Sequence, residues 1–127
     1  MALAPPAQHP HGMEENNFNE MFTDSTEVIF AFHGYVRIIH DLVHGRPQPE
    51  RFHVRGYMEE GTTTTPFDMV VLNNISRYQL AIEAIRRSGF KNADHAIELF
   101  ERKLEEHRHY IREHLEDMDE IKNWTWS

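Results

Sequence analysis

The chain has 127 residues, of which 39% are apolar and none is cysteine, so one domain with a modest core is possible, while disulfides and cysteine-based zinc sites are excluded. Its 13 basic and 21 acidic residues give a net charge of −8, which argues against nucleic acid and anionic membranes as partners. Because no apolar run approaches membrane-spanning length and residues 1–12 lack the order of a signal peptide, we expect a cytoplasmic protein.

The first 25 residues are expected to form an extended lead-in with one short helix. Three of the first ten residues are prolines, which disfavour regular secondary structure. Glu14–Phe22 then places three apolar side chains on one side of a helix. We therefore divide the chain into a lead-in, residues 1–25, and a domain, residues 26–127.

The next segments predict one parallel βαβ unit. Val28–Phe32 is a continuous apolar run, typical of a strand buried on both faces, and Phe52–Tyr57 alternates as a second strand does. Between them, Tyr35–His44 has apolar residues at helical spacing. A strand, a helix and a strand within about thirty residues imply parallel strands with a right-handed crossover. Two strands alone leave two open edges, so we expect further strands from a partner or a larger protein.

The remainder of the chain predicts helices. Thr65 as N-cap, Pro66 at the first position and Asp68 at the third are typical of a capped helix start. The Asn73–Asn74 pair interrupts this helix, and a second one is expected from Ser76 to Arg87, closed by Gly89. The last and longest helix carries an apolar stripe at spacings of three and four: Ile97, Phe100, Leu104, His107, Ile111, Leu115 and Met118.

Ten histidines raise the hypothesis of a metal site. His33, His40 and His44 would share one face if a single helix held them, but His33 is expected at the end of the strand. A metal also needs a third or fourth ligand in fixed geometry, for which the sequence offers only an unproven tertiary approach. His40 and His44 are therefore interpreted as solvated, and His107 as a core histidine with a satisfied ring nitrogen.

The threonine segment before Pro66 is the most distinctive polar feature. Hydroxyls and backbone N–H groups before a helix N-terminus can bind an anion, and Arg55 lies just upstream. Simple capping explains Thr65, but it leaves three threonines unexplained; on the residues alone, capping and loop ordering are favoured. The candidate interface or anion-binding loop comprises Arg55, Glu59, Glu60, Thr62, Thr63, Thr64 and Thr65, with His33, Tyr35 and His40 as secondary candidates.

Several segments together resemble a known family. They are His9–Gly12, Val28–Tyr35 with Ile38–His40, His53–Met69 and the terminal Trp124–Trp126. In this order and spacing they resemble the C-terminal domain of the xylulose-5-phosphate/fructose-6-phosphate phosphoketolases, over nearly the whole chain. The sequence departs from the family pattern at Val36 and Arg37 and in the loop of residues 45–51.

The resemblance implies a fold and a reaction. The fold would be α/β, a partial transketolase C-terminal-like α/β sandwich with one parallel βαβ unit followed by helices. The whole enzyme would use thiamine diphosphate and Mg²⁺ to cleave xylulose 5-phosphate or fructose 6-phosphate with phosphate, giving acetyl phosphate and an aldose phosphate. The Gly-Asp-Gly sequence that binds the metal–diphosphate in thiamine-diphosphate enzymes does not occur in this chain. We therefore expect no cofactor, metal or catalytic site in this chain and no activity from it alone.

Three functional hypotheses stay open. The chain is a truncated product without activity, or a subunit of a split phosphoketolase that completes an active site or a dimer interface in trans. Alternatively, it is a stand-alone module that binds a phosphate ligand or a protein through its threonine loop. The expected partners are the rest of a phosphoketolase chain or subunit, or a second copy of this chain.

Overall fold

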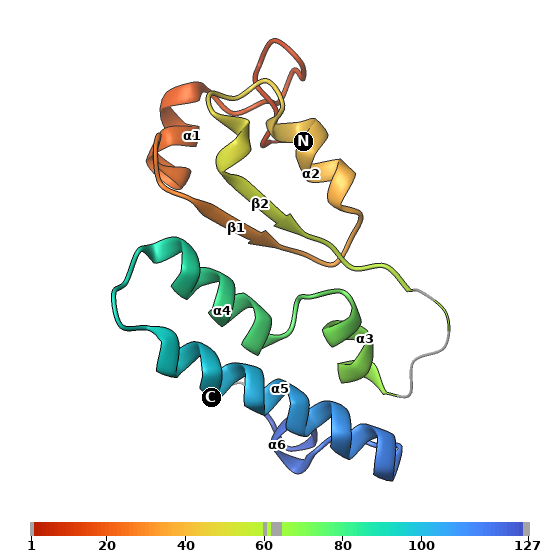
Figure 1. The fold of residues 1–127 in the computed structure, drawn as a ribbon. Helices are drawn as coiled ribbons and strands as arrows, with labels where there is room; N and C mark the ends of the chain where they lie inside the picture. The colour runs from red at the N-terminus through yellow and green to blue at the C-terminus, as the bar shows by residue number, and fades with distance from the viewer. Residues whose placement is uncertain (1, 60, 62–64, 126–127) are drawn as a thin grey trace. The chain divides into compact units, whose positions relative to one another are not determined.

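The computed structural model describes residues 2–59, 61 and 65–125, which divide between two compact units, Met1–Tyr57 and Met58–Ser127 (Figure 1). No helix in these residues is long and apolar enough to cross a membrane. The first unit contains α1 (Glu15–Phe22), β1 (Val28–Ala31), α2 (Val36–Val43), the 3-10 helix η1 (Pro49–Arg51) and β2 (Phe52–Arg55). The second contains α3 (Pro66–Leu72), α4 (Arg77–Ser88), α5 (Asp94–His114) and α6 (Asp119–Lys122).

The first unit confirms the predicted βαβ arrangement. β1 and β2 pair in parallel, from Val28 opposite Phe52 to Ala31 opposite Arg55, and α2 lies between them in the chain. The helices of the second unit follow, so the predicted order of a parallel βαβ unit and then helices is also confirmed.

One face of this sheet carries the core of the first unit. The buried residues Phe18 of α1, Ile39 and Val43 of α2 and Phe52 of β2 form a cluster against which Val28, Phe30 and Val54 also pack. Since side chains alternate along a strand, Ile29, Ala31, His53 and Arg55 belong to the opposite face.

The prediction that the first strand is buried on both faces is wrong for the chain in this structure. Val28, Ile29 and Phe30 are only half-buried, and Ala31 is exposed. The physical reason is that α1 and α2 both contribute to the cluster on the same face of the sheet.

The N-terminal residues form turns and are not extended. The N–H of Met13 lies within hydrogen-bond distance of the carbonyls of Ala2 and Ala4, so the segment folds back on itself. The buried guanidinium of Arg46 holds this loop by donating to the carbonyls of Leu3, Ala4 and Met13 at 3.0, 2.9 and 2.7 Å. Desolvation lowers the pKa of Arg46. The proline-rich segment thus forms turns, and the buried guanidinium of Arg46 holds these turns in place.

In the second unit, α3 and α4 begin at side-chain caps. Thr65 caps α3 as predicted, because its Oγ1 accepts a hydrogen bond from the N–H of Asp68 at 3.0 Å. Ser76 and Gln79 form a reciprocal capping box at the start of α4, and Gly89 closes that helix at φ +70°. Helices α4 and α5 lie side by side (Figure 1). The core of this unit consists of Phe67, Val71, Tyr78, Leu104 and Ile111.

The apolar stripe of the last helix ends sooner than predicted. Helix α5 stops at His114, and Leu115 takes a left-handed conformation (φ +58°) with 70% of its surface exposed. The chain turns there and returns, so that Ile121 of α6 packs against the core of the unit. Leu115 therefore terminates the helix and does not extend its buried face.

Candidate functional site

The carboxyl ends of the two strands come together through a pair of glycines. The N–H of Tyr57 donates to the carbonyl of Gly34 at 2.9 Å, and a Cβ on Gly56 would lie only 2.4 Å from the same oxygen. This close approach stacks the exposed ring of His33 on Tyr57, with ring centroids 4.4 Å apart. Open α/β sheets bind ligands at the carboxyl ends of their strands, so His33 and Tyr57 occupy a position suited to function.

The other candidate residues of the first unit are Arg55, Tyr35 and His40, and not all of them lie at these carboxyl ends. Arg55 is the last residue of β2, and its carbonyl accepts from the N–H of Phe32 at 3.1 Å. Tyr35 directly precedes α2 and is 60% exposed. His40 lies further along α2, where it is exposed. The structure thus brings His33, Tyr35 and Arg55 to one edge of the sheet, whereas His40 is placed on the helix.

Part of the threonine segment lies outside the described residues: Glu60, Thr62, Thr63 and Thr64. Glu59 is exposed, and Gly61 has a left-handed conformation with φ +60°. Thr65 is buried, and its hydroxyl donates to Oδ1 of Asp117 at 2.5 Å while it caps α3. Capping and the link to Asp117 account for Thr65, and anion binding by the segment stays a prediction.

The side chain of Asn73 binds the start of the same segment, although the sequence predicted only that Asn73 interrupts a helix. The amide of Asn73 accepts from the N–H of Met58 and donates to its carbonyl, both at 2.9 Å, and also donates to the carbonyl of Met69 at 3.0 Å. Asn74 adopts φ +58° and accepts from the side chain of Gln79 at 3.0 Å. The two asparagines do end α3, as predicted. The side-chain amide of Asn73 also binds both backbone groups of Met58, as a peptide group of a neighbouring strand would.

Met58 and Thr65, the residues on either side of 59–64, are thus each bound by a side chain, Met58 by Asn73 and Thr65 by Asp117. The sequence analysis missed both anchors. The ability of an asparagine amide to pair with both polar groups of a peptide was the available signal for Asn73. Asp117 had no signal, because it lies 52 positions from Thr65.

A polar cluster lies within the second unit. The hydroxyl of the buried Tyr78 donates to Oε1 of Glu120 at 2.6 Å and lies 3.1 Å from Nε2 of His107. This imidazole is fully buried, and Nε2 also contacts Oε1 of Glu120. His107 was predicted as a core histidine with a satisfied ring nitrogen, and Nε2 does have hydrogen-bond partners. At Nδ1, however, the described residues provide no hydrogen-bond partner.

The cluster changes the acidity of two of its members. Burial, reinforced by the hydrogen bond to Glu120, raises the pKa of Tyr78 to about 12. The hydrogen bonds from Tyr78 and His107 lower the pKa of Glu120. The carboxylate is therefore the charged form favoured in the fold, next to a neutral phenol.

The described residues do not fit a metal–diphosphate cofactor. The amides of Asn73 and Asn74 are engaged with Met58, Met69 and Gln79. In the ranges that the structure covers, no group of three His, Asp or Glu side chains could hold a metal ion. We therefore assign no step through such a cofactor to these residues.

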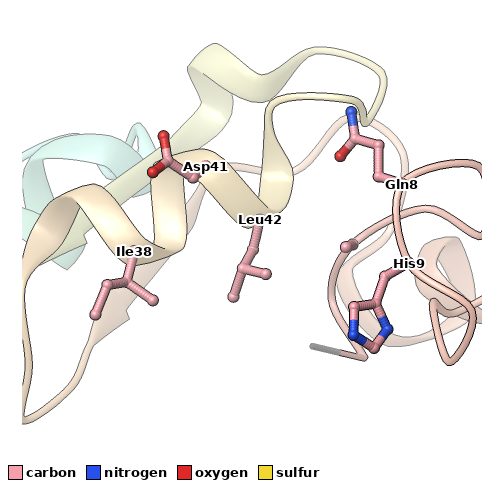
Figure 2. A pocket seen from close by; sticks show the side chains of 6 residues that line it. Gln8, His9, Ile38, Asp41 and Leu42 are labelled. Carbon is pink, nitrogen blue, oxygen red and sulfur yellow. The ribbon is translucent and has the colours of Figure 1, made fainter.

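A pocket of about 330 Å³ opens in the first unit between the N-terminal loop and α2 (Figure 2). Ile38 and Leu42 extend from the helix, and the ring of His9 lies across from Leu42. The described residues that line it are Ala4, Gln8, His9, Ile38, Asp41 and Leu42. Two segments that carry the family resemblance, the first at His9 and the second at Ile38, thus meet at one pocket.

Comparison with known proteins gives consistent matches. A family model described as "XFP C-terminal domain" matches residues 1–126. A protein of Brucella abortus (strain 2308) named "Probable phosphoketolase" is 51% identical over 129 residues, which are 100% of this chain and 16% of that protein. A protein of the same name from Bradyrhizobium diazoefficiens is 52% identical over 128 residues, 99% of this chain and 16% of the relative. The chain thus spans about 16% of the length of these relatives.

Proposed function

The chain belongs to the phosphoketolase family, where it corresponds to the C-terminal domain, and from this premise we propose that it has a structural or interface role in a phosphoketolase and is not catalytic alone. The observation that carries the proposal is the match of residues 1–126 to that domain, together with a share of only 16% of each relative. The whole enzyme would cleave xylulose 5-phosphate or fructose 6-phosphate with phosphate to acetyl phosphate and an aldose phosphate. Thiamine diphosphate and Mg²⁺ would be held by other parts of it.

The sheet of the first unit supports an interface role. Two strands make a small sheet, and strand edges are templates for further strands. The face with Ile29 and Ala31 lies opposite the face that α1 and α2 cover. Its composition is mixed, because His53 on the same face pairs with Glu27. Apolar and charged groups together are typical of interfaces between domains, so the remainder of a phosphoketolase would pack on this face.

The threonine loop would face a cleft or a subunit interface of the whole enzyme. Asn73 and Asp117 support this idea, because they fix both ends of the loop by hydrogen bonds and not by burial of a large apolar area. Hydroxyls and a guanidinium can bind a neighbouring loop or an anion in the same way. The proposed interface residues are Arg55, Glu59, Glu60, Thr62, Thr63, Thr64 and Thr65.

A chimera tests the interface role. The matching 129 residues of the Brucella abortus relative are deleted or are replaced by this chain, and acetyl phosphate formation and the mass of the assembly are measured. We expect the deletion to abolish both and the replacement to restore both. Ile29→Lys in the chimera should prevent assembly, whereas Asn16→Lys, at an exposed position of α1, should not. A deleted enzyme that is as active as the intact one would rule the proposal out.

A second variant tests the loop. In the chimera, Thr62, Thr63 and Thr64 are changed together to valine, with Thr125→Val at an exposed position as control. We expect the triple variant to lose activity or assembly with little change in melting temperature. Full activity with unchanged assembly would leave only the capping role of Thr65.

A further inference from the structure

We propose that Tyr78, His107 and Lys103 form a carboxylate-binding site, and that Glu120 of the same chain occupies it. The three side chains come from α4 and α5, and all lie near one carboxylate of α6. Tyr78 donates at 2.6 Å, His107 contacts the same oxygen, and the ammonium of Lys103 lies 3.7 Å from the second oxygen. A phenol, an imidazole and an ammonium group are the donors that proteins use to bind a carboxylate.

Two of the three donors belong to the core, whereas Lys103 and Glu120 are partly exposed. His107 has no exposed surface, and Tyr78 is 7% exposed. Phe67 stacks near the imidazole with ring centroids 4.9 Å apart, and Phe100 lies near the ring of Tyr78 at 6.3 Å. Aromatic walls fix the two donors and lower the local dielectric, so each hydrogen bond to a charged acceptor gains strength.

The geometry at His107 indicates which ring nitrogen belongs to the site. Nδ1 is buried and has no hydrogen-bond partner among the described residues, whereas Nε2 contacts Oε1 of Glu120. A buried N–H without an acceptor costs more than a bare ring lone pair that is left alone in a core. Nε2 is therefore the nitrogen of His107 that faces Glu120, and the ammonium of Lys103 lies beside the second carboxylate oxygen.

Helix α6, which carries Glu120, makes few apolar contacts with the rest of the unit. α6 has four residues and no buried side chain, and only Ile121 packs against the core. Further attachment comes from Glu120, from Asp117 just before α6, which accepts from Thr65, and from Trp124 just after it, whose ring lies 5.5 Å from the guanidinium of Arg77. Short elements held in this way belong to the least stable parts of a fold, so the removal of the Glu120 side chain should leave the three donors in place for another carboxylate.

Chemical rescue tests the site in the full chain. Glu120→Ala removes four non-hydrogen atoms from the side chain, and acetate supplies four, including both oxygens. NMR signals of the His107 ring and of the Tyr78 ring report binding at the site. We expect acetate to shift these signals saturably in Glu120→Ala and not in the unchanged chain, with chloride at equal ionic strength as the control.

Three additional measurements sharpen the test. Tyr78→Phe combined with Glu120→Ala should weaken acetate binding by about tenfold, because one charge-assisted hydrogen bond is lost. Glu120→Gln keeps the shape of the occupant and should exclude acetate. N-acetylglutamate N-methylamide, compared with acetate on Glu120→Ala, tells whether the site prefers a protein side chain or a small acid. A folded Glu120→Ala chain whose His107 signals ignore both acids would overturn the proposal, as would equal shifts in the unchanged chain.

Discussion

Two buried arginines hold the first unit together at places that sequence reasoning did not identify. Arg46 binds three carbonyls of the N-terminal loop and lies 4.2 Å above the ring of Phe18. Arg51 donates to the carbonyls of Phe22, Thr23 and Thr26 at 2.7–2.8 Å, at the end of α1, where a helix leaves carbonyls unpaired. Neither role has a local sequence signal, because the partners lie 25 to 43 positions away.

Arg46→Lys should destabilise the first unit by about 2 kcal/mol, since an ammonium cannot reproduce several directed hydrogen bonds and the contact with the ring. Denaturant unfolding gives the free energy of unfolding. The control is Arg37→Lys, whose side chain is 89% exposed and pairs with Asp41, and it should stay within about 0.5 kcal/mol of the unchanged chain. Equal effects of the two changes would contradict the structural role of Arg46.

The phenol of Tyr78 should titrate at a higher pH in the folded chain than in the unfolded chain. Its pKa in the folded chain is about 12, above the unfolded value of about 10, so the fold retains the phenolic proton longer than the unfolded chain does. The resulting stability is fully present below pH 10 and is lost as the pH rises from about 10 to 12. Absorbance at 295 nm during an alkaline titration should show a late step that Tyr78→Phe removes and that Tyr35→Phe leaves in place. A late step that survives in Tyr78→Phe would refute the assignment.

At the scale of elements, local patterns predicted the first two strands, the helix between them and the start of α3. These elements depend on residues close in sequence: alternation in the strands, helical spacing, and the Thr65-Pro66 cap. The predictions that were wrong concern places where the chain folds back on itself. The turns of residues 2–13 depend on Arg46, and the end of α5 at His114 allows α6 to return to the core. Periodicity contains no information on such distant partners.

The link between Asp117 and Thr65 should couple the C-terminal segment to α3. Asp117→Ala removes the acceptor of the Thr65 hydroxyl, so we expect a loss of about 1 kcal/mol and faster amide exchange at Asp68, whose N–H the same hydroxyl binds. Asp119→Ala is the control, because that side chain is 83% exposed and lies 4.0 Å from Lys122. Unchanged exchange at Asp68 in Asp117→Ala would show that the two elements are independent.

For the molecule as a whole, the sheet that seemed too small in the sequence is indeed two-stranded among the described residues. The candidate site was predicted less completely. Sequence reasoning chose His33, Tyr35 and Arg55, which meet at one edge of the sheet, but it missed Tyr57, which stacks on His33. It also treated Asn73 as a helix break, because the hydrogen bonds to Met58 join positions 15 residues apart.

The small sheet should make the isolated chain self-associate. Sedimentation velocity over a range of protein concentrations should show a rising mean mass, because Ile29 and Ala31 lie on the face opposite α1 and α2, and no third strand pairs with β1 or β2 among the described residues. Ile29→Lys should reduce the association, whereas Asn16→Lys should not. A monomer at all concentrations with a sharp two-state melt would contradict this expectation.

We propose that this chain completes a phosphoketolase and does no chemistry alone. The most direct test mixes the purified chain with a Brucella abortus relative from which the matching residues are deleted, and measures acetyl phosphate formed from xylulose 5-phosphate and phosphate with thiamine diphosphate and Mg²⁺. We predict that neither protein alone exceeds a protein-free blank and that the mixture does. Acetyl phosphate formed by the chain alone, or a mixture no more active than the deleted relative, would contradict the claim.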